Sequence, residues 1–368
     1  MVSVTTKLSN NVLSAEDSQE ELAQLASTAG AKVVGKLSQS LHVPSKRYYL
    51  GKGKLQELLR LKDSIKYNVA IFDDELTPLQ QRNLEEALGV KVIDRAALIL
   101  DIFARRAQTR EGKIQVDLAQ HQYLLPRLAG QWSHLGRLGG GIGTRGPGES
   151  QLETDRRIIR QKIHRLNAQI EKVRKQRLLY RHRRQKSSIP IVALIGYTNA
   201  GKSTLLNALS KAEVSIEDKL FTTLDTTTRR LTLSDNNVVL ISDTVGFIRK
   251  LPPEILTAFK ATLEELSEAK LLLHVVDITS HNALEQCKTV EEILAELGLM
   301  DKPRITALNK IDLLLPVNKS WEEEEAIDYL AHKYEEIDKT TVLISAGMKW
   351  GLSNLLELLA HTLSKITS

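Results

Sequence analysis

The chain has 368 residues, of which 42% are hydrophobic and 26% charged, a balance that is typical of a folded protein and excludes wholesale disorder. Its length predicts two or three domains. Cys287 is the only cysteine, which excludes an internal disulfide, and no apolar run approaches the ~20 residues of a membrane span. Without a signal peptide at its start, the chain is expected in the cytoplasm, and peripheral association with membranes stays open.

The net charge of +6 is concentrated in one segment. Residues 155–186 carry thirteen Lys or Arg and two acids, a net charge of +11, so the rest of the chain is net negative. Most charge runs are solvated helix faces. An imbalance of this size instead favours a polyanionic partner such as RNA.

Residues 1–110 alternate extended and helical patterns. Strands are expected within 31–39, 68–74 and 90–94, and helices within 20–30, 51–62, 77–89 and 95–108. For the helix at 77–89, Thr77 is the expected N-cap, and Pro78 suits the first turn. This alternation predicts a small N-terminal α/β domain.

Residues 111–186 have a different pattern. Two sets of residues recur at spacings of 4, 3, 4 and 3, namely Ile114, Leu118, His121, Leu125 and Leu128, then Ile159, Ile163, Leu166, Ile170 and Val173. Each set makes a narrow seam that one helix cannot bury alone, so an antiparallel helical hairpin is expected. The stretch GRLGGGIGTRGPG (136–148), with seven glycines, predicts a mobile Gly-rich loop at the tip, about 130–149. It contains G-x-G-x-x-G, but no strand precedes it, which argues against a dinucleotide site.

Residues 187–368 are expected to form one α/β domain, and its first motif is a phosphate-binding loop. GYTNAGKS (196–203) matches G-x-x-x-x-G-K-[ST], follows the apolar run IVALI and precedes a helical pattern. The glycines let the backbone curl around phosphate oxygens, towards which successive N–H groups point. Lys202 can reach the β- and γ-phosphates, and the Ser203 hydroxyl can bind Mg²⁺.

Three later motifs each follow an apolar strand pattern: DTVG (243–246), NKID (309–312) and SAG (345–347). Asp243 is placed to hold Mg²⁺ through water, and the Gly246 N–H can meet a γ-phosphate. The Asp312 carboxylate can accept two hydrogen bonds from guanine N1–H and its 2-amino group, a pattern that adenine lacks. Backbone N–H groups of SAG can meet guanine O6. Because parallel strands end at one edge of a sheet, one guanine-nucleotide site is expected there.

This ordered set of motifs resembles the GTPase superfamily. The resemblance makes FTTLDTTTR (221–229) the first switch segment, with Thr223 as second Mg²⁺ ligand and γ-phosphate sensor, and Thr222 as its alternative. The residues expected to bind nucleotide are Gly196, Tyr197, Thr198, Asn199, Ala200, Gly201, Lys202, Ser203, Phe221, Thr222, Thr223, Leu224, Asp225, Asp243, Thr244, Val245, Gly246, Asn309, Lys310, Ile311, Asp312, Ser345, Ala346 and Gly347. Lys202, Thr223 and Gly246 are the expected catalytic residues, and Ser203 and Thr223 the metal ligands.

One position departs from the superfamily pattern. Phe247 stands where many GTPases have a glutamine that orients the attacking water, so slow intrinsic hydrolysis is expected, with the missing group supplied by a partner or a rearranged switch. Arg229, Arg230 and Arg249 are candidates to stabilise charge, although solvated arginines are commoner. Asn199 occupies the place where some GTPases hold K⁺; a structural hydrogen bond within the loop is the alternative.

The stretch GGGIGTRGPGESQLETDRR (139–157) closely resembles the signature of the HflX family of GTPases, and GYTNAGKSTLLNAL, FTTLDTTTR, DTVGFI and NKID are similar to that family's nucleotide motifs. The resemblance implies a GTPase that binds the large ribosomal subunit and splits stalled or idle ribosomes. It also implies that Arg137 and Arg145 approach rRNA, with Arg156, Arg157 and Arg160 supporting the same surface.

Two alternatives share the basic hairpin. One is an RNA-modification or ribosome-assembly GTPase, and the other is a nucleotide-gated RNA-binding module. Some family members carry a small domain after the G domain, whereas SNLLELLAHTLSKITS (353–368) is enough only for the last helix of the G domain. Whether this chain makes the contacts of such a domain stays open, and the expected oligomeric state is a monomer.

Overall fold

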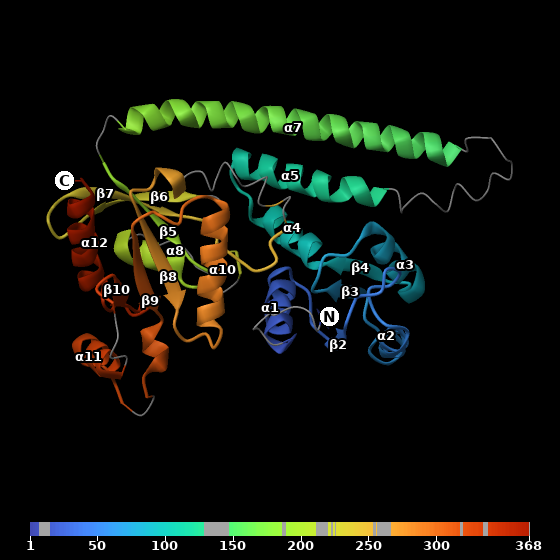
Figure 1. Ribbon diagram of the computed structural model, residues 1–368, viewed down its shortest axis with the longest axis horizontal. Coiled ribbons are helices and arrows are strands. Elements are labelled where there is room, and N and C mark those ends of the chain that lie inside the picture. The colour runs from blue at the N-terminus through green and yellow to red at the C-terminus, as the bar shows by residue number, and fades with distance from the viewer. Residues whose placement is uncertain are drawn as a thin grey trace. The chain divides into compact units, whose positions relative to one another are not determined.

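The computed structural model describes residues 1–6, 15–128, 147–185, 189–210, 220–221, 224, 226–252, 255, 266–316, 319–333 and 338–367. The chain divides into two compact units (Figure 1). The first consists of Met1–Val173 and Lys250–Ala258, and the second of Arg174–Arg249 and Phe259–Ser368. No helix in the described part of the chain is both long and apolar enough to cross a membrane.

The first unit contains a parallel four-stranded sheet of order β2-β1-β3-β4. Its strands are β1 (Val2–Thr6), β2 (Leu37–Leu41), β3 (Val69–Phe72) and β4 (Lys91–Asp94). The strands are connected by α1 (Ala15–Thr28), α2 (Lys52–Ile65) and α3 (Pro78–Leu88), and α4 (Arg95–Arg106) follows β4. The predicted α/β domain is thereby confirmed. The strand β1 was not predicted, because its five residues, VSVTT, form a short segment in which polar residues outnumber apolar ones.

Local sequence signals fix the ends of these helices. Thr77 accepts a hydrogen bond from the Gln80 N–H, and the Gln80 side chain accepts one from the Thr77 N–H, which makes a capping box. Pro78 occupies the first turn as predicted, and Gly89 ends α3 at a left-handed φ of 58°. The Asp94 side chain caps α4 by accepting from the Ala97 N–H at 2.9 Å.

The helical hairpin consists of α5 (Arg110–Leu124), the 3-10 turn η1 (Leu125–Arg127) and α7 (Pro147–Gln185). Within the first unit, α5 and α7 run antiparallel (Figure 1), and the Lys162 ammonium pairs with the Asp117 carboxylate at 3.0 Å. Along α7, Leu166 is buried, and the other predicted seam residues are half-buried. The predicted Gly-rich loop, with Arg137 and Arg145, lies almost wholly outside the described residues.

Helix α5 also has a second buried face that the spacing analysis missed. Gln115, Val116, Ala119 and Tyr123 are buried, and α5 packs against α4. The Tyr123 hydroxyl donates to Asp94 at 2.9 Å, which ties α5 to the end of β4. The polar Gln115 and Tyr123 conceal this face from a purely apolar pattern.

The second unit contains a six-stranded sheet of order β10-β9-β8-β5-β7-β6, in which only β6 runs antiparallel. Its strands are β5 (Ile191–Ile195), β6 (Thr227–Thr232), β7 (Val238–Asp243), β8 (Leu271–Asp277), β9 (Arg304–Asn309) and β10 (Thr341–Leu343). Its helices are α8 (Lys202–Ser210), α10 (Ala283–Glu296), α11 (Glu323–Lys333) and α12 (Leu352–Thr367), with the 3-10 turn η3 (Ile311–Leu314). The central strands β5 and β8 are almost wholly buried, so their sequences are continuous apolar runs. The parallel strands end at one edge of the sheet.

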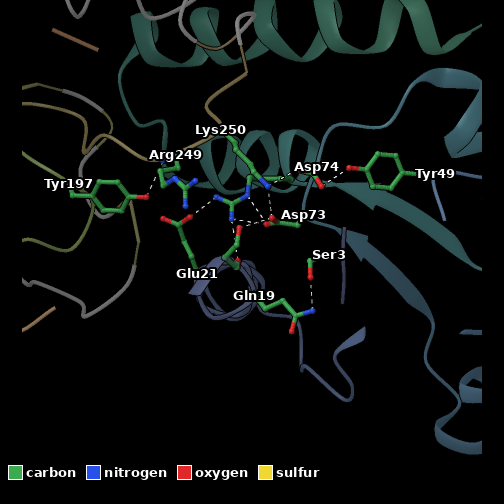
Figure 2. A network of polar contacts seen from close by, with 11 residues as sticks. Ser3, Gln19, Glu21, Tyr49, Asp73, Asp74, Tyr197, Arg249 and Lys250 are labelled. Carbon is green, nitrogen blue, oxygen red and sulfur yellow. Dashed lines mark hydrogen bonds and ion pairs between the residues drawn. The ribbon is translucent and has the colours of Figure 1, made fainter. Parts of the chain in front are cut away.

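A buried ionic network lies at the carboxyl edge of the first unit's sheet (Figure 2). Arg95, only 2% exposed, donates to Asp73 at 2.8 Å and to Glu21 at 2.7 Å. The second Asp73 oxygen accepts from Lys250 at 2.6 Å, and Lys250 also pairs with Asp74 at 2.5 Å. Burial alone would raise the pKa of Asp73, but Arg95 and Lys250 hold that pKa below its usual value.

Removing Arg95 should therefore be far more costly than removing an exposed arginine. We expect Arg95→Ala to lower the free energy of unfolding by about 3 kcal/mol, because Asp73 and Glu21 lose their shared buried partner. Arg105→Ala is the control, since its pair with Asp101 is 60% and 50% exposed and is worth under about 1 kcal/mol. Urea denaturation followed by circular dichroism measures both. Equal losses would show that the network contributes no more than a surface pair.

Candidate nucleotide site

The loop between β5 and α8 depends on two glycines. Gly196 has a φ of 147°, and a Cβ there would lie 2.2 Å from the Val275 carbonyl oxygen of β8. Gly201 has a φ of 94°, and a Cβ there would lie 2.2 Å from Asn309 Nδ2. Any side chain would therefore clash as well as strain the backbone. The motif spacing thus produces a loop that is packed against both β8 and β9.

Lys202, the first residue of α8, is enclosed by this loop. Its ammonium donates to the carbonyl oxygens of Gly196 at 3.0 Å and Tyr197 at 2.7 Å. Burial lowers the pKa of Lys202 to about 8, although Asp243 opposes the shift. A buried ammonium that is held mainly by neutral carbonyls is well suited to receive phosphate oxygens.

The DTVG motif begins where β7 ends, next to this loop. The Ser203 hydroxyl donates to Asp243 Oδ2 at 2.7 Å. A hydroxyl beside a carboxylate supplies the oxygen atoms that Mg²⁺ prefers in proteins, so this pair fits that ion. A Cβ on Gly246 would lie 2.9 Å from Thr198 Cα and 3.0 Å from Lys202 Nζ. Only glycine therefore lets the DTVG backbone approach the loop.

Backbone hydrogen bonds join the two motifs. The Phe247 N–H donates to the Gly196 carbonyl at 3.1 Å, and the Thr198 N–H donates to the Phe247 carbonyl at 2.8 Å. The Arg249 N–H donates to the Tyr197 hydroxyl at 3.1 Å (Figure 2). The Phe247 side chain is 3% exposed, so it contributes to the core and offers no polar group to a water molecule.

The remaining motifs meet at Asn309, the last residue of β9. Its side-chain NH₂ donates to the Ala200 carbonyl at 2.8 Å, and its oxygen accepts from the Ala346 N–H at 2.9 Å. The Ser345 hydroxyl donates to Asp312 Oδ1 at 2.6 Å. The phosphate loop, NKID and SAG are thus locked together as predicted from their strand-end positions.

The structure describes only some of the other residues that were predicted to line the nucleotide site. Phe221 and Leu224 are buried, whereas Thr222, Thr223 and Asp225 lie outside the described residues. Asn199 is exposed at a left-handed φ of 62°, and its side chain makes no hydrogen bond to any described residue. The expected alternative of a structural bond within the loop is therefore not observed there.

The arginines that were predicted to stabilise charge or to bind RNA lie in three parts of the chain. Arg229 and Arg230 lie on the edge strand β6, and Arg249 follows the DTVG motif. On α7, Arg157 and Arg160 are exposed and Arg156 is half-buried.

Sequence reasoning missed two contributors to this region. The first is the Tyr197 hydroxyl, which accepts a hydrogen bond from the Arg249 N–H. Tyr197 was predicted only as a residue of the phosphate-binding loop, without a role for its side chain. Asp277, at the end of β8, pairs with the Lys310 ammonium at 2.7 Å. A usable signal was present for Asp277, because LLLHVVD is an apolar run that ends in an acid, a pattern typical of a buried parallel strand.

A parallel sheet with a phosphate-binding loop between β5 and α8, and with DTVG, NKID and SAG at the same edge, defines a P-loop GTPase. The model of the 50S ribosome-binding GTPase family matches residues 191–310. Models of the N-terminal and middle regions of a GTP-binding GTPase match residues 16–104 and 106–184.

Among curated relatives, GTPase HflX of Caldanaerobacter subterraneus subsp. tengcongensis is 50% identical over 96% of this chain and 78% of its own length. GTPase HflX of Escherichia coli is 44% identical over 94% of this chain and 79% of its own length. A solved complex of SsGBP with GDP is similar over 100% of this chain and 99% of that chain, with 25% identity and a TM-score of 0.49. The chain belongs to the HflX family of GTPases, and it hydrolyses GTP to GDP and phosphate.

The glycine geometry predicts a sharp effect of one methyl group. Gly201→Ala should abolish measurable binding of a fluorescent GDP analogue, because the new Cβ displaces the Asn309 amide. Gly298→Ala is the matched control, since Gly298 also has a positive φ, 69°, but a Cβ there meets nothing within 4 Å. Gly298→Ala should therefore introduce backbone strain without a steric clash, and it should bind GDP normally. Normal binding by both variants would contradict the Asn309 account.

The depressed pKa of Lys202 predicts proton uptake on nucleotide binding. With a pKa of about 8 in the free protein, Lys202 is largely neutral at pH 9, and phosphate stabilises its charged form. GDP affinity should therefore fall as the pH rises above 8, with uptake of up to one proton. Calorimetry in buffers of different ionisation enthalpy measures this uptake. Lys202→Met should bind more weakly without this proton, and an unchanged uptake would assign it to another group.

Proposed function

We propose that this GTPase associates with the large ribosomal subunit and splits or rescues ribosomes, with GTP hydrolysis stimulated by the ribosome. The observation that carries the proposal is the basic helix α7, on which Arg157, Arg160 and Arg165 are exposed. An extended cationic surface is suited to the phosphate backbone of RNA. The ribosome-binding description of the family that matches residues 191–310 supports the same partner.

In this proposal the nucleotide site works through the residues described above. Lys202 and the N–H groups of the loop bind the phosphates, and Asp312 with the SAG backbone recognises guanine. Ser203 and Thr223 would hold Mg²⁺, with Asp243 nearby; the ion would neutralise phosphate charge. Thr223 and the Gly246 N–H would contact the γ-phosphate and so sense its presence.

Hydrolysis then needs a group that the free chain does not present at position 247. Because the Phe247 side chain is buried, a ribosomal group or a rearranged first switch would orient the attacking water. An RNA-modification or ribosome-assembly GTPase, or an RNA-binding module gated by nucleotide, would use the same surface with another target.

Co-sedimentation with large ribosomal subunits tests the proposal. Binding should be strong with a non-hydrolysable GTP analogue, weak with GDP, and reduced by salt. Replacing Arg156, Arg157 and Arg160 by Ala should weaken this binding and ribosome-stimulated hydrolysis while GTP binding by the free protein is retained. The control removes equal charge from exposed residues of the second unit, Lys288, Lys333 and Lys339. Salt-insensitive binding that is equal in both nucleotide states would overturn the proposal.

A second test concerns the monovalent cation. If Asn199 helps to hold K⁺ beside the phosphates, hydrolysis should be faster in KCl than in NaCl at equal ionic strength, and Asn199→Ala should remove the difference. Multiple-turnover phosphate release measures both rates. Equal rates for the unmodified protein in the two salts would exclude a K⁺ site.

A further inference from the structure

Lys310, in the NKID motif, has an unusual backbone conformation. Its φ of 66° lies in the left-handed region, where residues with a Cβ are strained. The residue stands between the end of β9 and the turn η3, so its neighbours Asn309 and Asp312 both belong to the site described above. A long flexible side chain at this position needs an external contact to keep one orientation.

Asp277 supplies that contact from the adjacent strand. Asp277 and Asn309 are paired in register at the ends of β8 and β9. Asp277 Oδ2 accepts from the Lys310 ammonium at 2.7 Å. Its other oxygen, Oδ1, accepts from the Thr279 N–H at 3.0 Å and from the Thr279 hydroxyl at 2.6 Å. Because both oxygens are engaged, the carboxylate cannot rotate freely.

We propose that Asp277 is a positioning residue for guanine-nucleotide binding and acts by holding the Lys310 side chain. With its ammonium fixed on Asp277, the methylene stem of Lys310 is held as an apolar wall beside Asp312, against which the face of a base can lie. The held ammonium also stays away from the Asp312 carboxylate, whose Oδ1 is bound by Ser345. The inference rests on the proposed role of Asp312 in guanine recognition.

The pair is partly shielded, with side-chain exposures of 25% for Lys310 and 17% for Asp277. A moderate effect is therefore expected. Asp277→Asn keeps an oxygen for Thr279 but removes the negative charge, and it should speed the dissociation of a fluorescent GDP analogue roughly three- to fivefold. Thr279→Val, which removes only the hydroxyl contact, should have a smaller effect. High salt should narrow the difference between Asp277→Asn and the unmodified protein.

A double-mutant cycle separates this role from a merely structural one. Lys310→Met keeps an apolar stem without the ammonium, so adding Asp277→Asn to it should change the dissociation rate no further. If Asp277→Asn accelerates dissociation equally in both backgrounds, the residue acts on the β8 turn and the inference is wrong. Thermal unfolding of each variant checks that the fold is retained. If Asp277→Asn fails to fold, the dissociation rate of Lys310→Met alone measures the contribution of the Lys310 ammonium.

Base selectivity distinguishes this inference from the site assignment on which it rests. Inosine lacks the 2-amino group, so Asp312→Asn should reduce the preference for GDP over IDP. Asp277→Asn should weaken both nucleotides by the same factor and preserve that preference. An unchanged preference in Asp312→Asn would refute the guanine-site assignment itself. An altered preference in that variant, together with normal dissociation from Asp277→Asn, would refute only the role of Asp277.

Discussion

The nucleotide site depends on the two hydrogen bonds made by the Asn309 side chain. One bond reaches the phosphate loop at Ala200, and the other reaches the SAG segment at Ala346. Ala200 lies 109 residues before Asn309 and Ala346 lies 37 residues after it, and the buried Asn309 amide joins these segments through one donor and one acceptor. Without it, the phosphate loop would lose its side-chain bond to β9, and the SAG segment would lose the bond made by the Ala346 N–H. This geometry gives Gly201 its strict size limit.

Much of the fold followed from local patterns because its strands and helices are regular. The strands β3, β4, β5, β7 and β9 end in motifs that the sequence displays openly, and the cap at Thr77 obeys a local rule. The strand β1 was missed because five residues carry too little periodicity. The second face of α5 was missed because Gln115 and Tyr123 are polar residues that become buried through specific hydrogen bonds. The partner of the Tyr123 hydroxyl, Asp94, lies 29 residues earlier in the chain, beyond any local sequence pattern.

The same distinction applies to the site. Lys202, Asp243 and Asn309 stand at fixed positions in recognisable motifs, so the sequence was sufficient to bring them to one edge of a sheet. Asp277 belongs to no such motif, and its relevance appears only when β8 and β9 lie side by side. Phe247 shows the reverse case: the absence of a polar group could be predicted from the sequence, whereas the burial of its ring required the structure.

One of the three points at which the chain passes between the two compact units is the peptide bond between Arg249 and Lys250. Arg249 is bonded through its N–H to the phosphate loop, and Lys250, at a left-handed φ of 52°, is gripped by Asp73 and Asp74 of the first unit. Within the first unit, the Asp73 and Asp74 carboxylates therefore hold the Lys250 side chain while its backbone stays in the left-handed region, where a residue with a Cβ is strained.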